Sequence, residues 1–282
     1  MEGKLYLCAT PIGNLEDITF RVLKTLKEVD LIAAEDTRHS IKLLNHFGID
    51  TPMTSYHEFN KYDKARYLVN EMLQGKNVAI ITDAGTPGIS DPGEELVRQC
   101  FDKGIEVSSL PGPAALITAL TMSGQRTRRF AFEAFLPSDK KERANILEEL
   151  KNETRTIILY EAPHHLLGTL RELLNSLGNR SITLCKELTK VHENANKTTI
   201  EELVLKYENE APKGEFVLVI EGKSLEEKRQ EEIDNYMEME VAEHMDIYLK
   251  QGIDKKEAMK KVAKDRGVSK RDIYNELLKT EK

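Results

Sequence analysis

The feature that most constrains the fold is a repeated pattern in which an apolar run ends in a loop of small residues and a helical pattern follows. Its clearest example is the apolar run 78–81, which ends in the glycine- and proline-rich loop 83–91 before a helix that begins near Pro92. The same unit recurs at residues 5–9 with loop 10–15, and at residues 107–110 with loop 111–115. Repeated strand-loop-helix units predict an α/β fold with a mainly parallel sheet covered by helices.

The length of 282 residues predicts two domains or more. The repeating pattern stops at the polar stretch 124–129, which contains Arg126, Arg128 and Arg129, and alternating strand patterns follow it. The last apolar strand pattern ends near Gly222. We therefore expect an N-terminal α/β domain over residues 1–123, a second α/β domain over 124–222, and a linker with a small helical region over 223–282.

The composition, 40% hydrophobic and 32% charged, is typical of a globular protein. No apolar stretch approaches the roughly 18 to 20 residues that a membrane span needs, and the first ten residues resemble a strand rather than a signal peptide, so we expect a cytoplasmic protein without membrane contacts. The three cysteines are far apart, and the seven histidines form no constellation with metal-ligand spacing. The sequence predicts neither disulfides nor a metal site.

Charge is distributed unevenly along the C-terminal region. Residues 226–254 contain three basic and ten acidic residues, a net of −7, whereas residues 255–282 contain ten basic and five acidic residues, a net of +5. Apolar positions from Ala258 to Leu278 indicate two helices joined by a short turn, and Ser269 with Asp272 is typical of a helix start. Such a unit could contact phosphates, or it could be a structural appendage that packs on the body.

The three small-residue loops all leave the carboxyl ends of predicted strands, so in one parallel sheet they should gather at one edge. Small residues there let the backbone approach a ligand of nucleotide size, although each loop alone could also be an ordinary turn. The chain has neither the Gly-x-Gly-x-x-Gly nor the Gly-x-x-x-x-Gly-Lys-Ser/Thr phosphate motif, and no Lys or Arg backs these loops. An adenosine ligand without a phosphate chain, such as S-adenosylmethionine, fits this pattern better.

Eight short motifs occur in order along the chain. They are Thr-Pro-Ile-Gly-Asn-Leu at 10–15, Ala-Ala-Glu-Asp-Thr-Arg at 33–38, Thr-Asp-Ala-Gly-Thr-Pro at 82–87, Ser-Asp-Pro-Gly at 90–93, Leu-Pro-Gly-Pro-Ala at 110–114, Tyr-Glu-Ala-Pro-His at 160–164, Glu-Leu-Thr-Lys at 187–190 and Lys-Gly-Glu-Phe-Val at 213–217. Together, over about residues 5–222, the chain resembles the bacterial small-subunit ribosomal RNA (cytidine-2′-O)-methyltransferases of the tetrapyrrole methylase-like family.

The resemblance implies two α/β domains with S-adenosylmethionine in the cleft between them, a homodimer, and ribosomal RNA or the small ribosomal subunit as the partner. Pro11 and Gly13 would border the cleft, and Tyr160 would close over the adenosine. The remaining cofactor residues that the motifs imply are Asp83, Ala84, Gly85, Thr86, Ile89, Ser90, Pro111, Gly112 and Pro113. The chain departs from the family at His165, where an arginine is usual, so an RNA-binding role for that arginine cannot be transferred.

Methylation of a ribose hydroxyl needs in-line positioning, and it gains from a base or a cation that makes the hydroxyl more acidic. The candidates for this role are Glu35, Asp36, Glu187 and Lys190, together with Lys186, all near predicted strand ends. They could equally form an ion-pair network that only lines the cleft. Two other functions remain open: methylation of a small tetrapyrrole-type acceptor, and non-enzymatic binding of nucleic acid with a vestigial cofactor site.

Overall fold

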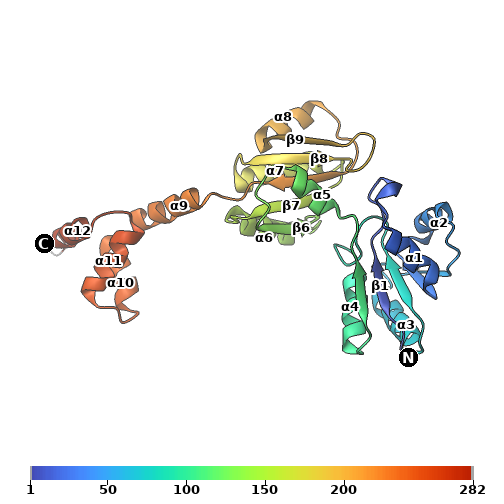
Figure 1. The fold of residues 1–282 in the computed structure, drawn as a ribbon. Coiled ribbons are helices and arrows are strands. Elements are labelled where there is room, and N and C mark those ends of the chain that lie inside the picture. The colour runs from blue at the N-terminus through green and yellow to red at the C-terminus, as the bar shows by residue number, and fades with distance from the viewer. Residues whose placement is uncertain (1, 281–282) are drawn as a thin grey trace.

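The computed structural model describes residues 2–280, which form two α/β domains followed by a group of helices (Figure 1). The first sheet has five strands in the order β3-β2-β4-β1-β5, and all neighbouring strands are parallel. Its strands are β1 (Leu5–Cys8), β2 (Leu31–Ala34), β3 (Met53–Ser55), β4 (Val78–Ile81) and β5 (Val107–Leu110). The predicted α/β class with a parallel N-terminal sheet is confirmed, although the sequence patterns had not indicated the three-residue β3.

Helices cover both faces of this sheet, which explains the continuous apolar runs: every residue of β4 is buried. On one face α3 and α4 pack against β1 and β4, and on the other α1 and α2 pack against β1, β2 and β4. Thr19 caps α1, and a short 3-10 helix, Leu15–Asp17, precedes it. The helices are α1 (Phe20–Glu28), α2 (Thr37–His46), α3 (Lys61–Leu73) and α4 (Gly93–Asp102).

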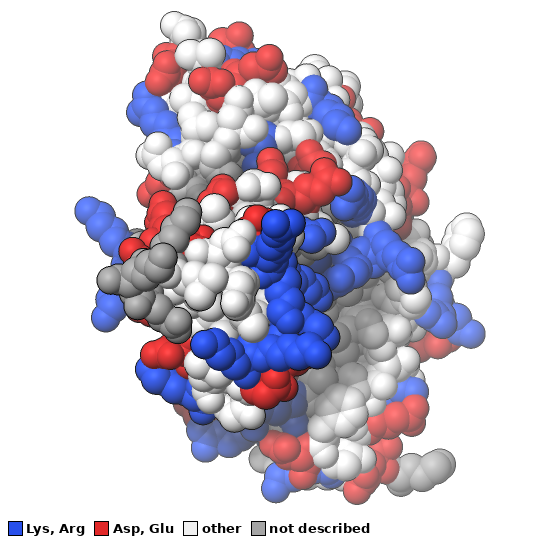
Figure 2. Space-filling view, turned by 90° about the vertical axis from the view of Figure 1, so that its left-hand side faces the viewer, with Lys and Arg blue, Asp and Glu red and all other residues white. Residues whose placement is uncertain are grey.

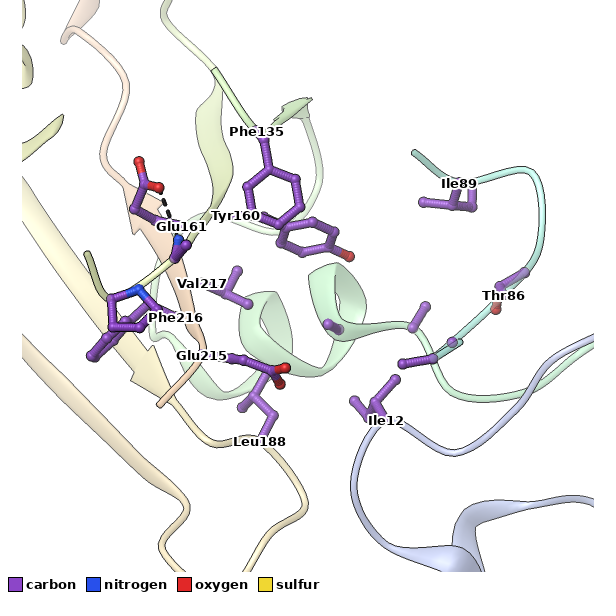
Figure 3. A pocket seen from close by; sticks show the side chains of 16 residues that line it. Ile12, Thr86, Ile89, Phe135, Tyr160, Glu161, Leu188, Glu215, Phe216 and Val217 are labelled. Carbon is purple, nitrogen blue, oxygen red and sulfur yellow. Dashed lines mark hydrogen bonds between the residues drawn. The ribbon is translucent and has the colours of Figure 1, made fainter. Parts of the chain in front are cut away.

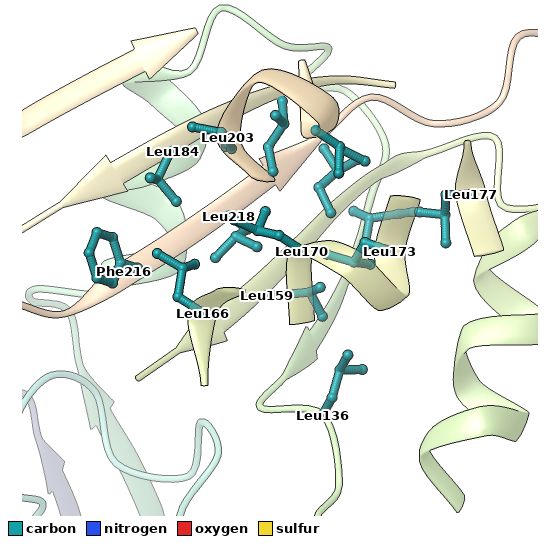
Figure 4. Packing of buried hydrophobic residues seen from close by; sticks show 14 of the residues in the cluster. Leu136, Leu159, Leu166, Leu170, Leu173, Leu177, Leu184, Leu203, Phe216 and Leu218 are labelled. Atoms are coloured by element: carbon teal, nitrogen blue, oxygen red, sulfur yellow. The ribbon is translucent and has the colours of Figure 1, made fainter. Parts of the chain in front are cut away.

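The second sheet is mixed, with the order β6-β7-β10-β8-β9, and only its β6–β7 pair is parallel. Leucines and isoleucines from α6, α7, α8 and the strands form most of a core on one of its faces (Figure 4). The polar edge strand β9 was not predicted. The elements are β6 (Phe130–Ala134), α6 (Lys140–Lys151), β7 (Thr156–Glu161), α7 (Leu166–Leu177), β8 (Ser181–Lys186), β9 (Asn194–Thr199), α8 (Ile200–Asn209) and β10 (Phe216–Ile220).

Helix α5 (Ala115–Met122) follows the last strand of the first sheet but packs against the second sheet. Leu116, Ala119 and Leu120 are buried in one cluster with residues of β7, β8 and β10. The predicted domain boundary after residue 123 stays a prediction. Helix α5, which precedes that residue, shares a hydrophobic core with the second sheet. The chain therefore crosses between the domains at residues 111–114.

The C-terminal region consists of α9 (Leu225–Glu238), α10 (Val241–Leu249), α11 (Lys255–Asp265) and α12 (Lys270–Thr280). Helices α10 to α12 enclose a small apolar core of their own, and α9 carries them away from the second domain (Figure 1). The predicted helix start at Ser269 is confirmed, because Ser269 and Asp272 bond each other's backbone N–H. Helix α10 was not predicted. Within residues 2–280, no helix has the length and apolar character needed to cross a membrane.

Candidate functional site

A pocket of about 450 Å³ lies between the two domains (Figure 3). On the side of the first domain and α5, loop backbone and mostly small side chains line the pocket. On the side of the second domain, larger apolar side chains and acidic side chains line it. The residues that line it are Ile12, Ala84, Gly85, Thr86, Ile89, Ala114 and Ala115 on one side, and Phe135, Tyr160, Glu161, Ala162, Pro163, Leu188, Glu215, Phe216 and Val217 on the other. Its volume is in the range of small-molecule sites.

The three small-residue loops meet at this pocket, as the sequence predicted. Thr10 and Gly85 exchange two backbone hydrogen bonds, with N···O distances of 2.9 and 3.0 Å. Gly85 has a φ of 89°, a conformation that favours glycine. The Thr86 hydroxyl donates to the Pro113 carbonyl at 2.8 Å, which joins the second loop to the third. The loops thus form one hydrogen-bonded wall.

Asp91 organises the central loop from within. Its carboxylate accepts hydrogen bonds from the backbone N–H groups of Gly88, Ile89 and Gly93, at distances between 2.8 and 3.2 Å. Burial raises the pKa of Asp91, while these N–H bonds act in the opposite direction. Asp91 lies in the Ser-Asp-Pro-Gly motif, but it was not among the predicted site residues. Its role is to shape the loop that carries Ile89 to the pocket.

Tyr160 forms the wall opposite these loops. Its ring makes edge-to-face contacts with Phe132 and Phe135, at centroid distances of 5.0 and 5.5 Å, and its hydroxyl accepts a hydrogen bond from the Leu116 backbone N–H at 3.1 Å. Burial raises the pKa of the Tyr160 hydroxyl. Tyr160 therefore presents a fixed aromatic surface and also holds the start of α5.

The predicted cofactor residues fall into two groups. Five of them line the pocket: Ala84, Gly85, Thr86, Ile89 and Tyr160. The others lie next to the lining and do not form part of it: Pro11, Gly13, Asp83, Ser90, Pro111, Gly112 and Pro113. Two of these are glycines at close contacts: a Cβ on Gly112 would lie 2.5 Å from the Ala9 Cβ, and one on Gly13 would lie 2.6 Å from the Lys190 Cγ.

One cluster of predicted catalytic residues lies at the ends of β2 and β4. The Glu35 carboxylate accepts a hydrogen bond from the Thr82 hydroxyl at 2.6 Å, and the Asp83 carboxylate accepts one from the Asp36 N–H at 3.1 Å. Burial and the neighbouring Glu35 raise the pKa of Asp83. Asp36 itself caps α2 and pairs with Arg38, whose hydrogen bonds lower the pKa of Asp36 strongly. None of these side chains lines the pocket.

The second cluster follows β8. The Lys190 ammonium lies 3.1 Å from the Glu187 carboxylate and 2.8 Å from that of Glu215. Burial opposes the charge of Lys190, but its bonds to the two carboxylates outweigh burial and raise its pKa. The hydrogen bond from the Glu215 backbone, with a smaller contribution from Lys190, lowers the pKa of Glu187. Lys190 is therefore cationic and Glu187 anionic at neutral pH. Lys186 ends β8 and is half-buried.

Sequence reasoning missed Glu215, which lines the pocket and pairs with Lys190. It lies in the Lys-Gly-Glu-Phe-Val motif, so a signal was present. Phe135, Leu188, Phe216 and Val217 were also missed, because an apolar pattern does not indicate which strand ends face the cleft. His164 and His165 are exposed, and their rings contact each other before α7.

The lining fits S-adenosylmethionine better than a phosphorylated nucleotide. It contains no Lys or Arg, and its charged residues are Glu161 and Glu215. The Glu161 carboxylate is buried and bonded to the Ala162 N–H and the Thr169 hydroxyl, whereas the Glu215 side chain is largely exposed. An acidic group suits a sulfonium cation and repels phosphate. The apolar walls and free backbone groups would hold the adenosine.

The cysteines and histidines give no sign of redox or metal chemistry among residues 2–280. Cys8, Cys100 and Cys185 are buried and free, and burial raises the pKa of Cys8 and Cys100 to about 12. No group of three or more His, Cys, Asp or Glu side chains in the described part of the chain could hold a metal ion.

Two α/β domains around a pocket whose lining contains no Lys or Arg, with small-residue loops on a parallel sheet as one wall, make up the fold and site of this chain. The sequence profile described as Tetrapyrrole (Corrin/Porphyrin) Methylases matches residues 4–204, and the chain belongs to this family. The family resemblance inferred from the motifs is thereby confirmed.

Relatives of similar length carry a common name, Ribosomal RNA small subunit methyltransferase I. The Halalkalibacterium halodurans protein is 49% identical over 97% of this chain and 94% of its own length. The Bacillus subtilis protein is 46% identical over 97% and 93%, and the Synechocystis protein is 45% identical over 99% of both chains. The C-terminal helices are therefore inside the region that these relatives share.

Solved structures show the same fold at low sequence identity. A diphthine synthase has a TM-score of 0.61 at 13% identity and covers 78% of this chain and 90% of its own. A uroporphyrin-III C-methyltransferase from Thermus thermophilus, complexed with S-adenosyl homocysteine, has a TM-score of 0.54 at 21% identity and covers 77% and 97%. These likenesses stop before the full length of this chain.

Proposed function

We propose that this protein transfers the methyl group of S-adenosylmethionine to the 2′-hydroxyl of a cytidine in small-subunit ribosomal RNA. The observation that carries the proposal is the cation-free pocket, walled by the three joined loops and faced by Tyr160. The names of near full-length relatives point to small-subunit ribosomal RNA as the acceptor. The cytidine and the ribose oxygen are supported by the ordered motifs. A cytoplasmic location, where that RNA is found, stays a prediction.

When bound, S-adenosylmethionine would supply a methyl group on a sulfonium that is already a strong electrophile. The residues of the pocket would hold the adenosine against Tyr160 and keep water from it. Glu215, which lines the pocket and pairs with Lys190, would supply a negative charge near the sulfonium. Much of the rate enhancement would come from fixing the geometry.

In the transfer, the ribose oxygen forms a bond to the methyl carbon as the carbon–sulfur bond breaks, and the hydroxyl proton leaves. The cationic Lys190 cannot accept that proton, but its charge would stabilise a developing negative oxygen. Among the predicted groups we assign Asp83 as the proton acceptor: burial raises its pKa, whereas the hydrogen bond from the Glu215 backbone lowers the pKa of Glu187. We assign Glu35 and Asp36 to holding Asp83 in place.

The test uses labelled S-adenosylmethionine and small ribosomal subunits from cells that lack the modification. Label should appear in one 2′-O-methylcytidine after digestion to nucleosides, and subunits already methylated should take up none. Label on a base, or no label with either naked RNA or subunits, would contradict the proposal. A parallel screen of tetrapyrrole acceptors distinguishes RNA methylation from methylation of a small molecule, which would label a tetrapyrrole instead. Calorimetry with S-adenosylhomocysteine separates a non-enzymatic adaptor, which would show no heat of binding.

We also propose the homodimer that the resemblance implies. Phe20, Phe59 and Val191 each expose more than nine-tenths of their surface and would be available for contacts between two copies. Light scattering after size-exclusion chromatography measures the mass directly, and a particle of one chain, about 32.1 kDa, would contradict this part of the proposal.

A further inference from the structure

A second hollow, of about 500 Å³, lies between α9 and α11, outside the methylation pocket. Three cations, Lys228, Arg229 and Lys264, surround an apolar floor of Leu225, Ile233 and Tyr236. Figure 2 looks onto the molecule from the C-terminal helices, and Lys and Arg side chains gather there in a band. Cations around an apolar hollow are typical of surfaces that bind nucleic-acid strands.

The cations of this hollow differ from most of those on the body. Within residues 2–280, Lys228, Arg229 and Lys264 make no ion pair or side-chain hydrogen bond. On the two α/β domains, by contrast, many cations are paired with carboxylates, among them Lys61, Arg98, Arg143, Arg155 and Arg171. The charge of the hollow is therefore available to an anionic partner.

The acidic residue of the lining, Asp265, reduces the formal charge of the lining from +3 to +2 and is held by neighbouring helices. Asp265 accepts a hydrogen bond from the Tyr248 hydroxyl, and its carboxylate lies 3.3 Å from the His244 Nε2. His244 stacks on Tyr236 at 4.2 Å, and Arg266 donates to its Nδ1 at 3.3 Å. These contacts join α9, α10 and α11, so the walls of the hollow are braced against one another.

The hollow is far from the methylation pocket. Lys223, just before α9, donates its backbone N–H to the carbonyl of Glu153, which precedes the first residue of β7. Tyr160 and Glu161, which line the methylation pocket, lie at the other end of β7. At about 3.3 Å per residue, the six residues of β7 span roughly 20 Å. The exposed Arg126, Arg128 and Arg129 lie at the same end, since the Arg129 carbonyl bonds the Thr156 N–H.

We propose that the hollow between α9 and α11 binds the phosphodiester backbone of the acceptor RNA at a point remote from the methylated nucleotide. This inference rests on the proposed function and deepens it. Each released counterion at a neutralised phosphate adds to the affinity. An RNA that occupies both sites must span at least the length of β7, so a mononucleotide or dinucleotide reaches only one of them.

The test compares two full-length variants that lose the same three positive charges. One is Lys228→Gln with Arg229→Gln and Lys264→Gln; the control is Lys27→Gln with Lys42→Gln and Lys103→Gln, at exposed positions of the first domain. The hollow variant should lose about two to three units of the slope of log K against log salt, and its KM for small subunits should rise on the order of tenfold. Its kcat and its affinity for S-adenosylhomocysteine should stay at the wild-type values.

Three results would overturn the inference: an unchanged salt slope in the hollow variant, an equal loss in the control, or binding of the wild type to phosphatidylserine vesicles as tight as to RNA. RNA binding can be measured without methyl transfer, so the proposed function and the inference about the hollow are tested by different measurements. If the wild type methylates no RNA while the hollow variant still loses RNA affinity, the proposed function fails, and the hollow is an RNA-binding surface without a role in placing an acceptor. If methylation proceeds and the hollow variant matches the wild type, the proposed function stands and the inference fails.

A fluorescent reporter gives an independent readout, because the chain contains no Trp. Leu225 lines the hollow and is 70% exposed, so Leu225→Trp places one indole there with little cost in packing. Addition of RNA should quench this fluorescence and salt should restore it. A Leu205→Trp control, on the exposed face of α8, should not respond. An equal response of both variants would contradict binding at the hollow.

Discussion

The two walls of the interdomain pocket are built in different ways. The first domain contributes loops at the ends of parallel strands, where backbone groups and small side chains face the pocket. The second domain contributes side chains from a mixed sheet and its loops: the Tyr160 ring and the Glu215 carboxylate, which pairs with Lys190. The comparison teaches that the first wall depends on close backbone approach, which tolerates no added atoms, whereas the second depends on functional groups that can be exchanged singly.

The largest effect is expected where the first wall is most crowded. In Gly112→Ala the new Cβ would lie 2.5 Å from the Ala9 Cβ, so the loop must move away from β1. We expect a loss of about 1–3 kcal/mol in the free energy of unfolding and a fall in turnover on the order of 100-fold. Gly168→Ala is the control, because nothing lies within 4 Å of its Cβ position in α7. If Gly112→Ala turns over at the wild-type rate, the first wall does not depend on close backbone approach.

The next effect concerns the support of the central loop. Asp91→Ala removes the acceptor of three backbone N–H groups, which costs about 1–3 kcal/mol and lowers the affinity for S-adenosylhomocysteine by roughly 5- to 100-fold. Asp91→Asn keeps one carbonyl oxygen and should lose less. Calorimetric titration measures both variants. If alanine and asparagine behave alike, the hydrogen bonds of Asp91 do not maintain the loop.

A single functional group of the second wall should matter less. Tyr160→Phe keeps the ring and its contacts with Phe132 and Phe135 but removes the acceptor of the Leu116 N–H. We expect a loss of about 1 kcal/mol in stability and less than about a tenfold loss in cofactor affinity. Tyr160→Ala, which removes the ring, should weaken cofactor binding further. Equal affinities for the two variants would deny the ring a role in binding.

The pH dependence tests the assignment of the proton acceptor. Burial and the charge of Glu35 raise the pKa of Asp83, so Glu35→Gln should lower that pKa. Asp83 would then remain ionised to lower pH, and the acid limb of the rate of methyl transfer should move to lower pH. Single-turnover rates measured across pH 4–8 give the limb, with Glu28→Gln on α1 as the control. A limb that stays in place would remove Asp83 from the mechanism.

The smallest effect is expected from metal removal. Neither wall contains a cluster of metal ligands within residues 2–280. Dialysis of the protein against a chelator should therefore leave the rate at which it methylates RNA unchanged. Any effect of added Mg²⁺ on the rate should come from the folding of the RNA. A second, chemically distinct chelator is the control and should also leave the rate unchanged. Lost activity that returns with one particular metal would contradict this expectation.

The first wall could be predicted from the sequence and much of the second could not. Continuous apolar runs such as Val78–Ile81 indicate strands buried on both faces, and the parallel topology then places their loops at one edge. The edge strand β9, with the sequence Asn-Ala-Asn-Lys-Thr-Thr, has no apolar signal, because half-exposed polar residues form it. Glu215 lies in one of the ordered motifs, but its place in the pocket depends on how one sheet faces the other, which no local pattern shows. The catalytic roles of Glu35, Asp36, Glu187 and Lys190 stay predictions.

The crossing at residues 111–114 links the closure of the two domains to what the pocket contains. This segment joins β5 of the first sheet to α5, which packs on the second sheet, so it must absorb any rotation between them. Pro111 and Pro113 each fix one φ angle, and Gly112 is pressed against Ala9, which leaves few torsions to turn. Ala114, at the end of the segment, lines the pocket. A ligand in the pocket would therefore touch the same segment that joins the two domains, so that its binding and the placement of the domains are linked through Ala114.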